Sequence, residues 1–157
     1  MQSSPAGEHA GVLVIPPLLY LGAVAAGLLL EWLAPLGWRA APLTRAAGIG
    51  LVAAGLALAG WARRTFRRLG TDVHPRRPTT ALAWDGPYRF TRNPMYVGLT
   101  AGYVGLALAT SSIWTALLLI PVAILMHWGV VRREERYLDA KFGESYRAFR
   151  SRVRRYL

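Results

Sequence analysis

The sequence has 157 residues and a mass of 17.2 kDa, which is enough for one domain. Hydrophobic residues make up 54% and charged residues 17%, below the roughly 25% charge of soluble domains. The excess of 19 Lys and Arg over 8 Asp and Glu indicates a nucleic acid or an anionic membrane surface as partner. Long uncharged runs argue against nucleic acid. The lack of cysteine excludes disulfides, thiolate metal sites and a cysteine nucleophile.

The uncharged runs predict an all-α integral membrane protein with about four spans. The first run, 10–30, has 21 residues, close to the roughly 20 that cross a bilayer. It lacks the basic start of a signal peptide, because no Lys or Arg precedes Arg39. The 39 uncharged residues of 93–131 exceed one span and are expected to turn near 110–112. We therefore predict one domain, 1–157, with spans at about 10–31, 46–62, 94–110 and 113–131.

Small residues recur at intervals of four within the second and third predicted spans, as at Gly50 and Ala54 or Gly98 and Gly102. A dinucleotide-binding glycine loop would need a strand before it and a helix after it, and neither is predicted. The spacing instead indicates helices that approach each other closely in lipid.

The basic residues alternate with the spans. Two lie between the first two spans, eight lie in 63–92 and nine lie in 132–155, so 17 of 19 fall on one side of a four-span protein. The positive-inside rule then places that side, with both termini, in the cytoplasm.

Two polar stretches meet at this predicted cytoplasmic face. The stretch 63–93 is broken repeatedly by Pro and Gly and predicts a long functional loop. The stretch 132–156 predicts an amphipathic helix, broken at Gly143 and suited to the membrane surface. Its apolar face consists of Val131, Leu138, Phe142, Tyr146, Phe149 and Val153.

The acidic pair Glu134 and Glu135 follows the fourth predicted span directly. It is either a solvated ion-pair cluster or an anchor for a cationic or amino-bearing cofactor, since carboxylates so close to hydrocarbon are costly unless paired. The histidines His9, His74 and His127 are far apart, so we predict no metal site.

Two motifs resemble a known family. Residues 86–98, GPYRFTRNPMYVG, resemble the GPYR…R(H/N)PxYxG signature of isoprenylcysteine carboxyl methyltransferases, and phospholipid N-methyltransferases share a related pattern. Residues 134–138, EERYL, with the later Phe142, Gly143, Tyr146 and Val153, resemble that family's EExxL…FG…Y…V signature. The resemblance covers about 60–157 and points to the bacterial branch. It implies an integral membrane methyltransferase, in a bacterial inner membrane, that uses S-adenosylmethionine and releases S-adenosylhomocysteine.

The resemblance also implies a cofactor pocket between the ends of the last spans and the C-terminal helix. Its lining would consist of Tyr88, Arg92, Asn93, Pro94, Met95, Tyr96, Gly98, Glu134 and Glu135. The residue chemistry agrees, because carboxylates suit an ammonium group and the π-face of Tyr96 suits a sulfonium. Each of three residues also has a purely structural interpretation: Tyr96 as an interfacial aromatic, Gly98 as a helix-packing residue and Pro94 as the start of a helix.

Two positions depart from the family pattern. Asn93 stands where the classical family has His, and Val130 stands where eukaryotic members have Arg, so the roles of those residues do not transfer. His127 has two interpretations. It either points into the pocket or is an interfacial histidine next to Trp128.

The membrane setting suggests a hydrophobic or lipid-like methyl acceptor that enters between helices, with membrane lipids as neighbours. A carboxylate acceptor needs no base, whereas an amine or thiol benefits from one, and His74, Asp85 and His127 are the catalytic candidates. Two alternatives stay open: a phospholipid N-methyltransferase, and a non-catalytic basic scaffold that binds anionic lipid. The oligomeric state stays open too.

Overall fold

A computed structural model describes residues 14–70 and 82–157 of the protein, and every regular element within them is helical. The candidate base His74 lies outside the described residues. In chain order the elements are α1 (Pro16–Leu33), α2 (Pro42–Arg68), η1 (Gly86–Arg89), α3 (Pro94–Thr110), α4 (Ile113–Met126), η2 (His127–Val131), α5 (Arg132–Phe142) and α6 (Glu144–Arg152).

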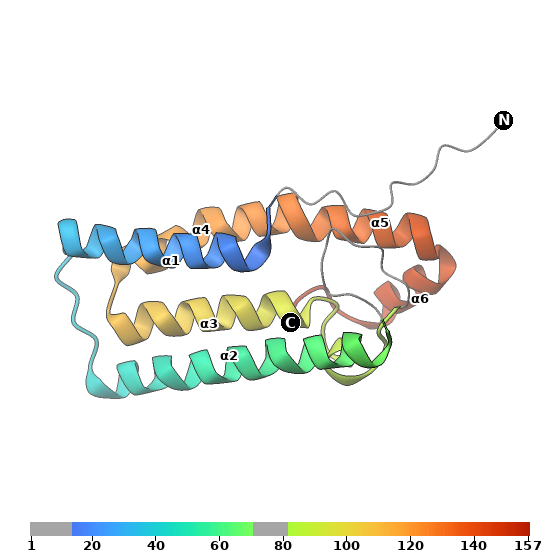
Figure 1. The fold of residues 1–157 in the computed structure, drawn as a ribbon, viewed down its shortest axis with the longest axis horizontal. Helices are drawn as coiled ribbons and strands as arrows, with labels where there is room; N and C mark the ends of the chain where they lie inside the picture. Colours follow the sequence, from blue (N-terminus) through green and yellow to red (C-terminus); the bar gives the residue numbers. More distant parts are fainter. Residues whose placement is uncertain (1–13, 71–81) are drawn as a thin grey trace.

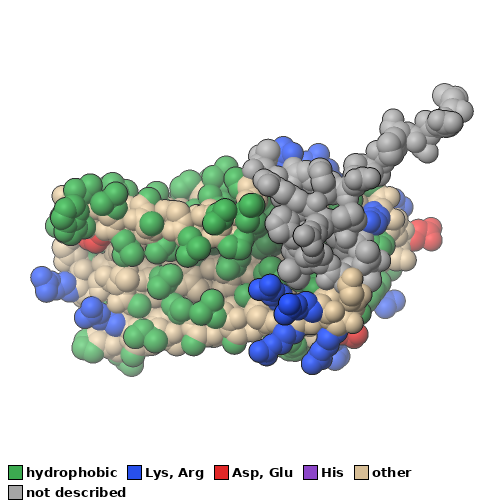
Figure 2. Space-filling view, in the orientation of Figure 1, with side chains coloured by type: hydrophobic (Ala, Val, Ile, Leu, Met, Phe, Trp, Pro, Cys, Tyr) green, Lys and Arg blue, Asp and Glu red, His purple; other side chains and the backbone are tan. Residues whose placement is uncertain are grey.

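The four long helices form an up-and-down bundle with two distinct ends (Figure 1). The α1–α2 connection and the α3–α4 turn lie at one end, which we call the turn end. The start of α3, the end of α2, α5 and α6 lie at the other, which we call the site end. Figure 2 shows apolar side chains along the bundle and Lys and Arg side chains towards both ends, most of them at the site end.

Three helical stretches are long and apolar enough to cross a membrane. They are Pro16–Leu33, Pro42–Arg68 and the continuous stretch Ile113–Phe142, which comprises α4, η2 and α5. Many of their large apolar side chains are exposed, for example Leu21, Leu56 and Ile120. An outward apolar surface of this kind is suited to lipid. The fold is therefore that of an all-α membrane protein.

Close packing of α2 against α3 depends on glycines spaced by seven residues. A Cβ on Gly55 would collide with the backbone of Gly98 and Gly102, and a Cβ on Gly48 would lie 2.7 Å from the Gly105 carbonyl oxygen. The expectation of helix packing through small residues is thus confirmed. The residues in the interface are Gly48, Gly55, Gly98 and Gly105, whereas Gly50 faces open space.

The second helix continues further than the uncharged run indicated. The expected span ended at residue 62, but α2 continues to Arg68 through two pairs of arginines. Its last turns are buried on one side, where Ala62 is fully buried and Phe66 contacts Tyr88 ring edge to face at 4.9 Å. Packing against the site-end loop therefore extends the helix beyond the uncharged run.

The α5–α6 hairpin covers the site end with its apolar face. Gly143 separates the two helices with φ +51°, a conformation that favours glycine. Tyr146 and Phe149 are 1% and 4% exposed and pack with Ala62, Ala83 and Tyr88. The expectation that this face lies on the membrane surface is wrong for these residues, because protein already covers their apolar side chains.

At the turn end, one carboxylate connects two helices. The Glu31 oxygens accept hydrogen bonds from the backbone N–H of Leu36 at 3.1 Å and of Trp114 at 3.4 Å, and from the Ser112 hydroxyl at 3.3 Å. Ser112 caps α4 by accepting from the Thr115 N–H. Glu31 therefore joins the end of α1 to the start of α4.

Candidate functional site

The two sequence motifs meet at the site end, where α3 begins and α5 passes over it. The Arg92 guanidinium lies 3.0 Å from the Glu135 carboxylate, and their side chains are 9% and 11% exposed. The Tyr96 hydroxyl donates a 3.0 Å hydrogen bond to Glu134. Each acid of the pair therefore contacts one residue of the Arg-Asn-Pro-Met-Tyr segment, some 40 residues earlier in the chain.

Local sequence explains how that segment is presented. Gly86 adopts φ +60° at the start of η1, and a Cβ there would lie 2.8 Å from the Thr65 hydroxyl oxygen. Glycine is therefore required for the loop to lie against α2. Pro94 occupies the first turn of α3, where the missing N–H costs least, and Asn93 stays non-helical with φ −128°.

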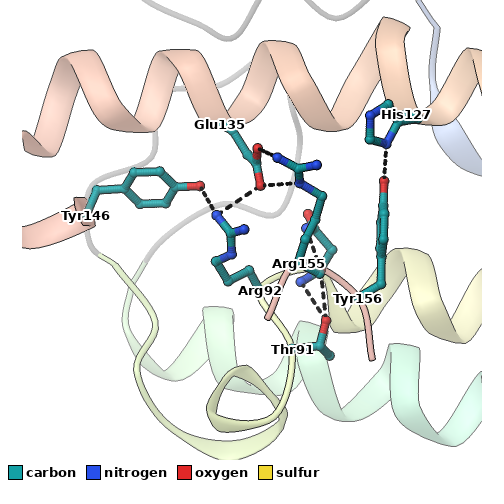
Figure 3. A network of polar contacts seen from close by, with 8 residues as sticks. Thr91, Arg92, His127, Glu135, Tyr146, Arg155 and Tyr156 are labelled. Atoms are coloured by element: carbon teal, nitrogen blue, oxygen red, sulfur yellow. Dashed lines mark hydrogen bonds and ion pairs between the residues drawn. The ribbon is translucent and has the colours of Figure 1, made fainter. Parts of the chain in front are cut away.

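A second arginine binds the same carboxylate. Arg155 donates from Nε and from a terminal nitrogen to the two oxygens of Glu135, both at 2.9 Å. Figure 3 shows Glu135 between Arg92 and Arg155, with the Tyr146 hydroxyl on the other side of Arg92 at 3.5 Å. Paired, bidentate contacts of this type are the strong form of a charged hydrogen bond.

One nitrogen of this network has no partner within the described residues. The Nε of Arg92 is buried and makes no hydrogen bond there. A buried donor of a charged group is costly to leave unpaired. It is therefore a position at which a ligand oxygen would be favourable.

The electrostatic environment of the site raises the pKa of several groups. Burial raises the pKa of Tyr88, and the nearby Glu134 carboxylate raises it further. Burial likewise raises the pKa of Tyr146, with Glu135 adding to the effect and Arg92 opposing it. Hydrogen bonding to Glu135 raises the pKa of Arg155. These tyrosines therefore stay neutral.

The wide helical turn η2 precedes the acidic pair. Its five residues, His127–Val131, form a π-helical turn, a feature that occurs frequently at functional sites. His127 Nδ1 lies 2.9 Å from the Tyr156 hydroxyl, and the Arg132 guanidinium lies over the Trp128 ring at 4.5 Å. His127 thus belongs to the site end, in contact with residue 156.

Not all of the expected pocket residues face the acidic pair. Gly98 faces α2, where a Cβ would lie 2.6 Å from the Gly55 carbonyl oxygen, so its close approach serves helix packing. Met95 packs beside the cluster that contains Tyr88 and Tyr146, and Pro94 is fully buried at the helix start. Asp85 is exposed on the loop before η1, and its carbonyl accepts from the Tyr88 N–H.

Sequence reasoning missed Arg155 and Thr91. Arg155 stands in a run of basic residues, and nothing in that run distinguishes it from Arg154 or Arg152. Val130, the position of a family arginine, is fully buried in the apolar cluster with Tyr20, Tyr103 and Met126.

Comparison with known proteins identifies the family. Residues 43–145 match the model of a family described as phospholipid methyltransferase. Over 68 residues the chain is 40% identical to the nickel-cobalt-cadmium resistance protein NccN of Alcaligenes xylosoxydans xylosoxydans. The aligned residues make up 43% of this chain and 32% of that protein. The chain is 35% identical to the cobalt-zinc-cadmium resistance protein CzcN of Cupriavidus metallidurans, again over 68 residues, which are 43% of this chain and 32% of that protein.

The chain spans about a third of the length of these two curated relatives. No solved structure matches it. Within residues 14–70 and 82–157, no group of three or more His, Cys, Asp or Glu side chains is arranged to hold a metal ion.

Proposed function

The chain belongs to the phospholipid methyltransferase family, and we propose that it transfers a methyl group from S-adenosylmethionine to a hydrophobic or lipid-like acceptor. The observation that carries the proposal is the pairing of two distant motifs. Arg92 contacts Glu135 and Tyr96 contacts Glu134, each at 3.0 Å. This pairing gathers anionic, cationic and aromatic groups at one end of an apolar bundle.

The residues present fit the cofactor's chemistry. S-adenosylmethionine carries a sulfonium and an α-ammonium as cationic groups and an α-carboxylate as an anionic one. Glu134 supplies a carboxylate for the ammonium, and the unpartnered Nε of Arg92 supplies a buried donor for an oxygen. The faces of Tyr88 and Tyr96 suit the sulfonium. S-adenosylhomocysteine is the product that these residues would release.

The two acids of the pair have different roles in this proposal. Glu135 already holds two guanidinium groups, so it organises Arg92 and Arg155. Glu134 accepts a hydrogen bond from a neutral hydroxyl, so among its described contacts no guanidinium competes with a cationic ligand. Glu134 is therefore the carboxylate that contacts the cofactor.

The chain's contribution to the reaction is alignment and exclusion of water. Methyl transfer from a sulfonium is an in-line displacement, for which orientation supplies much of the rate. An acceptor amine would also need a base, and His127 and Asp85 are the proposed candidates in the described part of the chain, with His74 outside it. His127 lies at the site end, where its Nδ1 contacts the Tyr156 hydroxyl.

The acceptor and the orientation are part of the proposal. The family match favours the amine of a phospholipid headgroup, and an isoprenylcysteine-like carboxylate is the second candidate. The arginine distribution supports a cytoplasmic site end with α3 as a fourth span beside α2. A bacterial inner membrane is the proposed location.

Calorimetric titration of detergent-purified protein with S-adenosylhomocysteine tests the cofactor. We expect micromolar binding that Glu134→Gln weakens at least tenfold, since the substitution removes a charge but keeps an acceptor for the Tyr96 hydroxyl. Asp139→Asn is the matched control, because Asp139 lies on the same helix in an exposed ion pair with Arg147. Wild-type protein that binds no cofactor, yet binds anionic vesicles, would support the scaffold alternative.

A methyl-transfer assay then identifies the acceptor. Radiolabelled S-adenosylmethionine is offered with phosphatidylethanolamine in mixed micelles or with a farnesylated cysteine. We expect label in the lipid, with loss of the label in the Glu134→Gln variant. Label in the cysteine derivative alone would identify the carboxylate acceptor instead.

A further inference from the structure

The segment 153–157 returns from the end of α6 across the candidate site. The Arg154 carbonyl accepts a 2.8 Å hydrogen bond from the Arg92 N–H, and Thr91 pairs with Arg154 in an isolated parallel bridge. The chain is extended there, since Val153 has φ −120° and ψ 132°. The segment therefore adds a backbone connection to the loop that presents Arg92.

Arg155 contacts both sequence motifs with different parts of itself. Its carbonyl oxygen accepts hydrogen bonds from the Thr91 hydroxyl at 3.0 Å and from the Asn93 side-chain amide at 2.9 Å. Its guanidinium binds both oxygens of Glu135. Figure 3 shows this residue between the loop and α5. Arg155 therefore fixes the distance between the loop at 91–93 and the acidic helix.

The two arginines on Glu135 differ in their surroundings. Arg92 is 9% exposed, whereas Arg155 is 37% exposed and lies at the outer side of the carboxylate. With Arg155 removed, Glu135 would keep Arg92 as its guanidinium partner within residues 14–70 and 82–157, and would lose the contact on its outer side. The carboxylate and Arg92 would then be free to shift together.

We propose that Arg155 is a positioning residue for cofactor binding: it holds Glu135 and the Asn93 segment at the separation that the cofactor requires, so that segment 153–157 completes the site. The inference rests on the proposed function. Its basis is the set of contacts that one residue makes to two motifs, with Tyr156 adding a third contact at His127.

The first test compares Arg155 variants by titration with S-adenosylhomocysteine. We expect Arg155→Ala to weaken binding about tenfold and Arg155→Lys to restore part of the loss, because lysine keeps the charge but not the bidentate geometry. Arg147→Ala is the matched control, since Arg147 lies on α6 in an ion pair and is 65% exposed. Should Arg155→Ala fold poorly, the lysine variant carries the comparison alone.

Hydrogen–deuterium exchange of the unliganded protein provides a second readout. Peptides that contain residues 91–93 should exchange faster in Arg155→Ala than in wild type, since the segment that accepts the Arg92 N–H loses its attachment to α5. The Arg147→Ala variant should exchange like wild type. Unchanged exchange in Arg155→Ala would overturn the positioning role.

The outcomes separate this inference from the proposed function. Wild-type protein that binds neither S-adenosylmethionine nor S-adenosylhomocysteine overturns the proposed function and, with it, a role of Arg155 in cofactor binding. Wild-type binding with unchanged affinity in Arg155→Ala overturns the inference alone. Tighter binding in Arg155→Ala also overturns it, because the segment would then obstruct the site.

Discussion

The two ends of the bundle both contain acidic residues near apolar helices, but they use them differently. At the turn end, Glu31 accepts hydrogen bonds from neutral donors: two backbone N–H groups and a hydroxyl. At the site end, Glu135 binds two guanidinium groups, and Glu134 lies beside it with one neutral hydroxyl partner. An acid near the membrane edge is therefore not a functional signal by itself. A cluster of charged groups larger than a helix end or a turn requires is a better signal of a functional site.

The segments joined at the two ends also differ. The turn end joins the α3–α4 turn, Ser111 and Ser112, to the end of α1 and to the α1–α2 connection, through contacts such as that of the Ala40 N–H with the Ser111 hydroxyl. The site end gathers the end of α2, the loop before α3, α5 and the segment after α6. The two ends therefore differ in the groups that are held: backbone and hydroxyl groups at the turn end, and two arginines with two carboxylates at the site end.

The largest expected effect is that of Glu135→Ala at the site end. It leaves the 9% exposed Arg92 without its carboxylate partner, which should destabilise the protein by about 3 kcal/mol. Thermal unfolding in detergent, followed by circular dichroism, measures the loss. Asp139→Ala, on the exposed side of α5, serves as control, and equal stability of the two variants would contradict a structural role for the Glu135 network.

An intermediate effect is expected between the two ends, at the α2–α3 interface. Gly55→Val places a side chain against the Gly98 backbone and should cost about 2 kcal/mol through forced separation of the helices. Gly50→Val, in open space on the same helix, should be nearly neutral. The same unfolding measurement applies, and a reversed order would show that α2 is rotated relative to the described interface.

A smaller effect is expected for Glu31→Ala at the turn end. The variant loses hydrogen bonds at the start of α4, worth about 1 kcal/mol, while cofactor binding should stay within twofold of wild type. Unfolding and titration are measured on the same preparation. A large loss of cofactor affinity would show that the two ends are coupled.

The smallest effect is expected for Tyr146→Phe. The hydroxyl lies 3.5 Å from Arg92, at the limit of hydrogen bonding, and Arg92 keeps its ion pair with Glu135. We expect a loss within about 0.5 kcal/mol and an unchanged affinity for S-adenosylhomocysteine. An affinity that fell as far as in Glu134→Gln would move Tyr146 into the binding site itself.

Much of the fold follows from features visible in the sequence. Uncharged runs indicate where helices lie, and prolines begin several of them: Pro16, Pro42 and Pro94 are the first residues of α1, α2 and α3. The continuation of α2 to Arg68 was not predictable from hydropathy. It depends on the packing of Phe66 against Tyr88, which is a tertiary contact.

The site, like the fold, was predictable only where residue type is informative, and not where it depends on tertiary contacts. The acidic pair and the Arg-Asn-Pro-Met-Tyr segment stand out by residue type, and the structure brings them together. Which of the last basic residues binds Glu135 depends on where the chain returns after α6, and sequence spacing does not encode that path. Gly98 shows the converse: a glycine next to the motif serves the helix interface.

The π-helical turn η2 has a consequence for the phase of the helix that contains it. A π turn closes its hydrogen bonds five residues apart instead of four, and each residue in an α-helix advances the direction of the side chain by about 100°. The turn at His127–Val131 therefore acts as an angular offset between the lipid-facing stripe of α4 and the acidic pair on α5. If the same residues wound as a regular α-helix, Glu134 and Glu135 would be rotated by roughly one residue's step of 100°, away from Tyr96 and Arg92, so this wide turn sets the direction of the charge relative to the membrane.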